Sequence, residues 1–122
     1  MKILIVEDNE VSIMLFTKLI GKYCKEILYA RNGVEAVEAC KQNPDIEIVL
    51  MDISMPIMDG YEATRKIRKF NKDVIIIAQT AHAFKDEKEK IIASGCNDYI
   101  AKPIDAYLLK MLMKRHLNNA HA

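Results

Sequence analysis

Short apolar runs alternate along the chain with longer segments in which apolar residues recur at helical spacing. The apolar runs predict strands at residues 2–6, 26–30, 46–51, 74–78 and 99–101. The helical segments lie at residues 9–22, 32–43, 60–70, 84–94 and 103–117. Three of the strands, at 3–6, 46–51 and 74–78, are almost continuously apolar, as is typical of strands covered on both faces. The pattern therefore predicts an α/β fold, with a doubly wound parallel sheet in a single domain over residues 1–122.

The composition fits a folded domain and excludes several other classes. Hydrophobic residues make up 51% of the chain and charged residues 29%, unlike a disordered chain. The formal net charge of +1 gives no overall basic field, so we expect no nucleic-acid partner. The apolar runs are too short to span a bilayer, and the N-terminus lacks a signal-peptide pattern. Cys24, Cys40 and Cys96 lack metal-ligand spacing. We expect reduced thiols, cytoplasmic localisation and no membrane contact by this domain.

Residues capable of chemistry follow four of the predicted strands. Glu7 and Asp8 follow the first strand, Asp52 the third, Thr80 the fourth and Lys102 the fifth. Ligands of doubly wound sheets bind outside the carboxyl ends of the strands, so we expect these residues to converge. Three neighbouring carboxylates repel one another and need a cation, and hard oxygen ligands favour Mg²⁺. Lys102 and Thr80 would then receive phosphoryl oxygens, and Asp52 would be a nucleophile that forms an aspartyl phosphate.

Several segments at these strand ends and nearby resemble a known family. The sequence reads IVEDN at 5–9, NGVEA at 32–36, MDISMPIMDG at 51–60, AQTA at 78–81 and DYIAKP at 98–103. Over its whole length the chain resembles the receiver domain of two-component response regulators. The run at 51–69 looks most like receivers of hybrid histidine kinases. This resemblance implies a flavodoxin-like, five-stranded sheet of order 2-1-3-4-5 with five helices.

The resemblance also implies roles for the metal site. Asp52 would be the phosphoacceptor of a two-component phosphorelay. Asp8 and Asp52 would contact Mg²⁺ directly, Glu7 would act through water, and the backbone carbonyl of Ser54 would complete the protein ligands. His82 and Ser54 would occupy variable positions that tune dephosphorylation in the family.

Three further residues have roles implied by the family. Lys102 would pair with the phosphoryl group, and the Lys102–Pro103 peptide bond is cis in many relatives. Thr80 would bind a phosphoryl oxygen and move on activation. Tyr99 would be the aromatic switch residue that rotates inward as Thr80 moves. On this interpretation the domain is not an enzyme for other substrates, because it catalyses only its own phosphorylation and dephosphorylation.

The resemblance implies a phosphohistidine donor, on a histidine kinase or a histidine phosphotransfer domain. The predicted helix at 9–22 carries two apolar stripes, which leaves two interpretations open. The stripe formed by Ile13, Phe16 and Ile20 would either dock this partner or join the core beside the other stripe. The other stripe consists of Val11, Met14, Leu15 and Leu19.

The residues after the first strand also bear on other functions that an α/β domain could have. A dehalogenase-type phosphatase would carry its nucleophilic Asp after the first strand, with a second Asp two residues on, whereas this strand ends in Glu7-Asp8-Asn9. A flavodoxin-like FMN protein would need a Ser/Thr/Gly-rich phosphate loop at that place. An interaction module that has lost phosphorylation stays open. The sequence is compatible with a free-standing regulator or with a receiver excised from a hybrid kinase.

Overall fold

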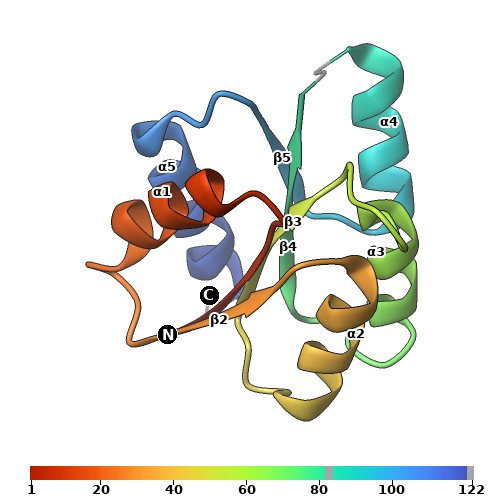
Figure 1. Ribbon diagram of the computed structural model, residues 1–122, viewed down its shortest axis with the longest axis horizontal. Coiled ribbons are helices and arrows are strands. Elements are labelled where there is room, and N and C mark those ends of the chain that lie inside the picture. Colours follow the sequence, from red (N-terminus) through yellow and green to blue (C-terminus); the bar gives the residue numbers. More distant parts are fainter. Residues whose placement is uncertain (82–83, 121–122) are drawn as a thin grey trace.

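The computed structural model of the chain describes residues 1–81 and 84–120, with backbone only for 118–120. Strands and helices alternate along it (Figure 1). The strands are β1 (Lys2–Val6), β2 (Glu26–Ala30), β3 (Ile48–Asp52), β4 (Ile75–Thr80) and β5 (Asp98–Ala101). The helices are α1 (Glu10–Ile20), α2 (Gly33–Gln42), α3 (Gly60–Arg68), α4 (Lys85–Ser94) and α5 (Ala106–Ala120).

The described strands form one parallel sheet in the order β2-β1-β3-β4-β5. Helices α1 and α5 cover one face, and α2, α3 and α4 cover the other (Figure 1). This architecture confirms the predicted doubly wound sheet and the strand order that the resemblance implied. Among the described residues, no helix is both long enough and apolar enough to cross a membrane.

Two cores lie on opposite faces of the sheet, because successive side chains of a strand point to opposite faces. The first core joins β-strand residues such as Ile76 and Ala78 to α2, α3 and α4. The second joins Ile48, Leu50 and their neighbours to α1 and α5. The central strands β1, β3 and β4 are buried on both faces, which explains their almost continuous apolar sequence.

The structure differs from the predicted boundaries at the edge that carries the candidate site. Strand β4 continues through the polar residues Gln79 and Thr80, because Thr80 still pairs with Ala101 of β5. Helix α5 begins at Ala106 rather than at residue 103. Asp105 precedes it and accepts a 3.1 Å hydrogen bond from the Leu108 amide, as a helix N-cap does.

Candidate functional site

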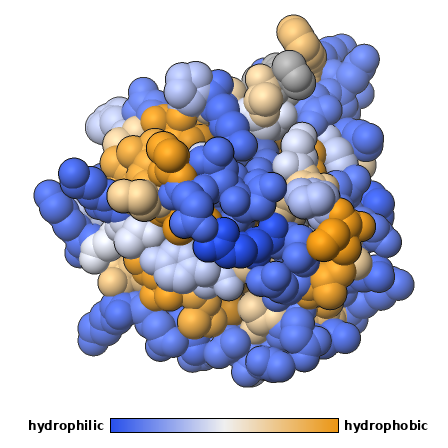
Figure 2. Space-filling view, viewed as in Figure 1, coloured by the Kyte–Doolittle hydropathy of each residue, from blue (hydrophilic) through white to orange (hydrophobic). Residues whose placement is uncertain are grey.

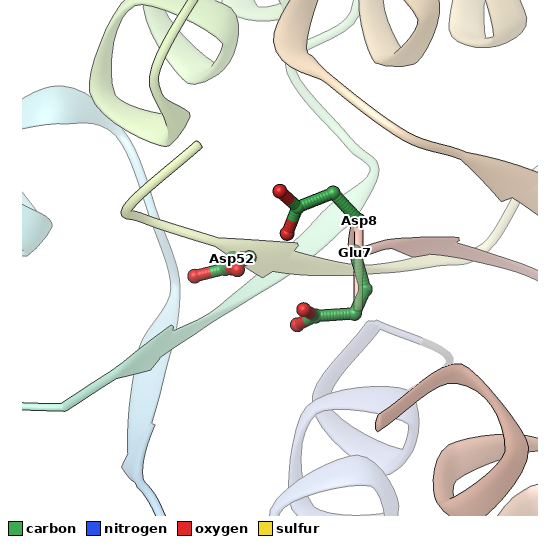
Figure 3. Close-up of side chains that lie close together, drawn as sticks. All are labelled: Glu7, Asp8 and Asp52. Atoms are coloured by element: carbon green, nitrogen blue, oxygen red, sulfur yellow. The ribbon is translucent and has the colours of Figure 1, made fainter. Parts of the chain in front are cut away.

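Three carboxylates meet at the carboxyl edge of the sheet (Figure 3). Glu7 and Asp8 follow β1, and Asp52 is the last residue of β3, the strand beside β1. Each offers one oxygen, and these oxygens lie within 4.8 Å of one another. Glu7 and Asp52 are only 1% and 3% exposed, whereas Asp8 is exposed. Hard oxygen ligands that are open to solvent on one side suit Mg²⁺, which keeps several of its waters.

The partners of the two buried carboxylates leave acceptor capacity free. The Asn9 amide donates to Glu7 Oε1 at 3.1 Å, and the Ser54 amide donates to Asp52 Oδ1 at 3.1 Å. Glu7 Oε2 is buried without a hydrogen-bond partner among the described residues. Burial, and then the Asp52 charge, raise the pKa of Glu7. A buried oxygen without a donor beside a second carboxylate fits a site that receives a cation.

Lys102 brings a cationic side chain close to these two carboxylates. The Lys102–Pro103 peptide bond is cis, as the resemblance implied. The Lys102 amide donates to the Thr80 carbonyl at 2.8 Å, which fixes the end of β5 against β4. The Lys102 Nζ atom lies 3.5 Å from Asp52 Oδ2 and 3.7 Å from Glu7 Oε2. These two distances place the ammonium beside the candidate nucleophile.

The loop after Asp52 is held tightly against the sheet. A Cβ atom at Gly60 would lie 2.5 Å from the Asp52 carbonyl oxygen and 2.9 Å from Ile53 Cα, so only glycine fits this close approach. Asp59 accepts a 2.9 Å hydrogen bond from the Glu62 amide and caps α3. Ile57 has a φ of 71°, a strained value for a β-branched residue. Strain of this kind is concentrated at functional sites, and sequence reasoning did not find it.

Thr80 and Tyr99 lie on neighbouring strands, β4 and β5. The Thr80 hydroxyl is 3.5 Å from Glu87 Oε1 on α4, and the same oxygen accepts a 2.5 Å hydrogen bond from Tyr61 on α3. Tyr99 is half-buried and packs against the first core, with Lys88 Nζ 5.4 Å from its ring centroid. Sequence reasoning gave no role to Tyr61 or Glu87, since no local pattern pairs two residues 26 positions apart. His82 lies outside the described residues.

The stripe of Ile13, Phe16 and Ile20 does not form a docking surface. Phe16 and Ile20 are 1% and 2% exposed and pack in the second core, so the docking interpretation is wrong for them. Ile13 is half-buried. Helix α1 therefore turns Phe16 and Ile20 toward the sheet, where their burial contributes to the second core. The exposed apolar side chains of α1 are instead Val11, Met14 and Leu15.

Comparison with known proteins identifies matching sequences and structures. Residues 3–114 match the response regulator receiver domain family. The chain is 40% identical over 131 residues to hybrid signal transduction histidine kinase B of Dictyostelium discoideum, a match that spans 96% of this chain and 7% of that protein. Two solved receiver domains are also similar. That of the sensor histidine kinase PA1611 from Pseudomonas aeruginosa has a magnesium ion coordinated in its active-site cleft (TM-score 0.85, 32% identity, 96% of this chain, 97% of that chain).

The second similar structure is the receiver domain of Ssk1 from Saccharomyces cerevisiae, solved with the histidine phosphotransfer protein Ypd1 (TM-score 0.84, 34% identity, 90% of this chain, 83% of that chain). The fold and the site of the present chain define a doubly wound α/β domain with a cluster of three carboxylates, two of them buried, at the carboxyl edge of its sheet. The chain belongs to the response regulator receiver domain family. Hybrid histidine kinases are among its relatives, as the run at 51–69 indicated.

Proposed function

We propose that this domain accepts a phosphoryl group on Asp52 in a Mg²⁺-dependent reaction of a two-component phosphorelay. The observation that carries the proposal is the set of Glu7, Asp8 and Asp52 carboxylates with the Lys102 ammonium beside Asp52. A metal site beside a buried carboxylate nucleophile is the arrangement that phosphoryl transfer needs, since catalysis depends on positioning and charge neutralisation.

In the proposed reaction, an Asp52 carboxylate oxygen forms a bond to phosphorus as the nitrogen–phosphorus bond of a phosphohistidine breaks. The freed imidazole keeps the electron pair of that bond. Asp8, Asp52 and the Ser54 carbonyl would hold Mg²⁺ directly, and Glu7 would hold it through water. The bound cation would neutralise charge on the transferring oxygens. Lys102 would leave its position beside Asp52 and Glu7 to pair with a phosphoryl oxygen.

Thr80 and Tyr99 are proposed to couple phosphorylation of Asp52 to a change of the protein surface. A phosphoryl group adds acceptor oxygens next to β4, and the Thr80 hydroxyl would donate to one of them. The half-buried Tyr99 ring would then rotate inward. This gives two states of the surface around α4 and β5, which phosphorylation biases.

The proposed donor is a histidine kinase or a histidine phosphotransfer domain, and α1 is the proposed docking element. Figure 2 shows apolar surface over α1 and α5. On α1 it includes Val11, Met14 and Leu15, which are 74%, 70% and 44% exposed. An exposed apolar patch of this kind, close to the phosphoacceptor edge of the sheet, suits a helical partner. In the similar Ssk1 structure, the receiver's partner is a histidine phosphotransfer protein.

Three further parts of the proposal concern the domain as a whole. Residues 1–122 would act as one receiver domain, would catalyse only their own phosphorylation and dephosphorylation, and would work in the cytoplasm. The chain spans only 7% of the length of its Dictyostelium relative, so the signal and the output of any longer protein lie outside this proposal.

The test is incubation with Mg²⁺ and a small acyl phosphate, followed by measurement of the intact mass. We expect one added phosphoryl group, which is lost in Asp52→Asn and absent when a chelator removes the metal. Asp59→Asn is the matched control, because it changes a neighbouring acid but keeps a side chain that caps α3. Absence of the adduct, together with no binding of beryllofluoride, would overturn the proposal in favour of an interaction module.

Docking is tested separately with a phosphorylated histidine phosphotransfer domain as donor. We expect Met14→Glu to slow transfer to Asp52 at least severalfold, while phosphorylation by the small acyl phosphate stays unchanged. Lys18→Glu, also on α1, controls for the added negative charge. Equal transfer rates in Met14→Glu and the wild type would exclude α1 as the docking element.

A further inference from the structure

Glu87, at the start of α4, joins two buried hydroxyl groups from other elements. Its Oε1 accepts a 2.5 Å hydrogen bond from Tyr61 on α3 and a weaker one, at 3.5 Å, from Thr80 at the end of β4. Tyr61 and Thr80 are 6% and 4% exposed. The phosphoryl chemistry proposed above uses Thr80 but gives no role to Tyr61 or Glu87.

The contact lies on the opposite face of the sheet from the Asp52 side chain. Side chains alternate between the faces of a strand. Ala78 belongs to the core under α2, α3 and α4, so Thr80, two residues later, points to the same face. Leu50 belongs to the core under α1 and α5, so Asp52 points to that face. The alternation therefore places the Thr80 side chain on the α4 side, and there its hydroxyl donates to Glu87.

Tyr61 anchors the Glu87 carboxylate in this position. The short hydrogen bond joins a hydroxyl to a charged acceptor, which is a strong combination. Burial, and then the hydrogen bond to Glu87, raise the pKa of Tyr61, so its hydroxyl stays a donor at neutral pH. Lys90 Nζ lies 4.5 Å from the Tyr61 ring centroid and holds α4 against the same ring. Glu87 itself is half-buried, and without Tyr61 its side chain would be free to turn toward solvent.

We propose that Glu87, anchored by Tyr61, is a positioning residue that holds back the Thr80 hydroxyl and opposes the phosphorylated state. This inference rests on the proposed function, in which Thr80 binds a phosphoryl oxygen. A threonine hydroxyl has one proton to donate. While that proton is donated to Glu87 it is not available to a phosphoryl oxygen, so a phosphoryl ligand of Thr80 must break the contact with Glu87. A ligand that binds only the state in which Thr80 has left Glu87 must supply the free energy of the lost contact. Its affinity is lower by that amount.

The effect is measured with beryllofluoride as the phosphoryl analogue, in the presence of Mg²⁺. We expect Glu87→Ala to lower the dissociation constant about two- to threefold, the low end of the range for one hydrogen bond, because the contact is long. Tyr61→Phe is expected to act in the same direction, and Glu87→Gln, which keeps an acceptor, to act less. Asp86→Ala is the control, since it removes an exposed acid from the same turn of α4.

A double-mutant cycle separates positioning from a general effect on α4. If Glu87 acts through Thr80, Glu87→Ala has no effect on beryllofluoride affinity in a Thr80→Ala background. The same tightening in both backgrounds would overturn the proposal. So would an unchanged dissociation constant in Glu87→Ala.

A second readout does not depend on phosphoryl binding. The NMR resonance of the Thr80 methyl group is expected to shift in Glu87→Ala and Tyr61→Phe but to stay in place in Asp86→Ala. An unmoved resonance in the first two variants would overturn the positioning role even in a protein that binds beryllofluoride. A shifted resonance in a protein that neither binds beryllofluoride nor forms the phosphoryl adduct would overturn the proposed function and leave the positioning role standing.

Discussion

The Lys102 ammonium lies 3.5 Å from Asp52 Oδ2, although β4 lies between β3, which ends at Asp52, and β5, which Lys102 follows. It also lies 3.7 Å from Glu7 Oε2. Both carboxylates are almost fully buried, whereas the Lys102 side chain is 34% exposed. One ammonium therefore offsets the repulsion between two buried carboxylates and stays free enough to move toward a new partner.

Replacement of this ammonium should make stability depend more strongly on metal. In the presence of a chelator, we expect Lys102→Met to lose about 1–3 kcal/mol of unfolding free energy at neutral pH, because two buried carboxylates lose their cation. Added Mg²⁺ should recover more stability in this variant than in the wild type. Urea unfolding with and without Mg²⁺ measures both changes.

The control is Lys66→Met, which breaks an exposed pair with Glu62 on α3. Surface pairs of this kind contribute little, so we expect a change below about 0.5 kcal/mol, independent of Mg²⁺. If the two lysine variants respond alike to Mg²⁺, Lys102 does not stabilise the carboxylate cluster.

The pH dependence of stability should identify Glu7. Burial and the Asp52 charge raise the pKa of Glu7 above its ordinary value of 4.5, so the folded protein holds a proton there more tightly than the unfolded chain. Without metal, the stability contributed by this proton is fully present below pH 4.5. It is lost as the pH rises from 4.5 through the raised pKa. Glu7→Gln should lack this loss.

The measurement is urea unfolding at a series of pH values above 4.5 in the presence of a chelator. The difference between the wild type and Glu7→Gln should grow with pH, by at most about 1.4 kcal/mol per pH unit. Mg²⁺ should act in the opposite direction, because it binds ionised carboxylates and so stabilises the protein more at higher pH. Parallel pH profiles for the two proteins would show that Glu7 titrates normally.

The gathering of the candidate site residues at one edge of the sheet was predictable from sequence, because it follows from the topology of the fold. Glu7 and Asp8 follow β1, Asp52 ends β3 and Lys102 follows β5, and parallel strands place their carboxyl ends at one edge. To predict that these side chains share an edge, one needs neither the packing of the helices nor the positions of individual loops and rotamers.

Contacts between helices were not predictable in the same way. The hydrogen bond from Tyr61 to Glu87 depends on the angle at which α3 and α4 pack, which no local pattern records. Helix α1 shows the same limit. Its two apolar stripes are both visible in the sequence, but the structure decides that Phe16 faces the sheet and Met14 faces solvent.

This division of α1 gives a prediction about stability. Phe16→Ala should lose about 3–5 kcal/mol of unfolding free energy, because it leaves a cavity in the second core. Met14→Ala should change it by less than about 0.5 kcal/mol, because Met14 is 70% exposed. Thermal or urea unfolding of the two variants measures the difference. Similar losses in both would mean that α1 buries its other face.

For Gly60→Ala, the sign of the change in unfolding free energy decides between helix propensity and steric clash. It is the first residue of α3, where helix propensity favours alanine over glycine by about 1 kcal/mol at most. On propensity alone, Gly60→Ala would stabilise the protein. The added Cβ would instead meet the Asp52 carbonyl oxygen at 2.5 Å and Ile53 Cα at 2.9 Å, and both are backbone atoms. We therefore expect a loss of about 1–3 kcal/mol, typical of overpacking.

The same substitution should disturb Asp52, the proposed phosphoacceptor. Relief of the clash moves either α3 or the end of β3, which carries Asp52. We expect Gly60→Ala to be phosphorylated more slowly by the small acyl phosphate than the wild type, at a temperature where both are folded. Ala93→Gly on α4, an exposed helix position far from Asp52 in sequence, should lose about 1 kcal/mol without slowing phosphorylation. A Gly60→Ala variant that is more stable and equally reactive would show that the loop after Asp52 has room to adjust.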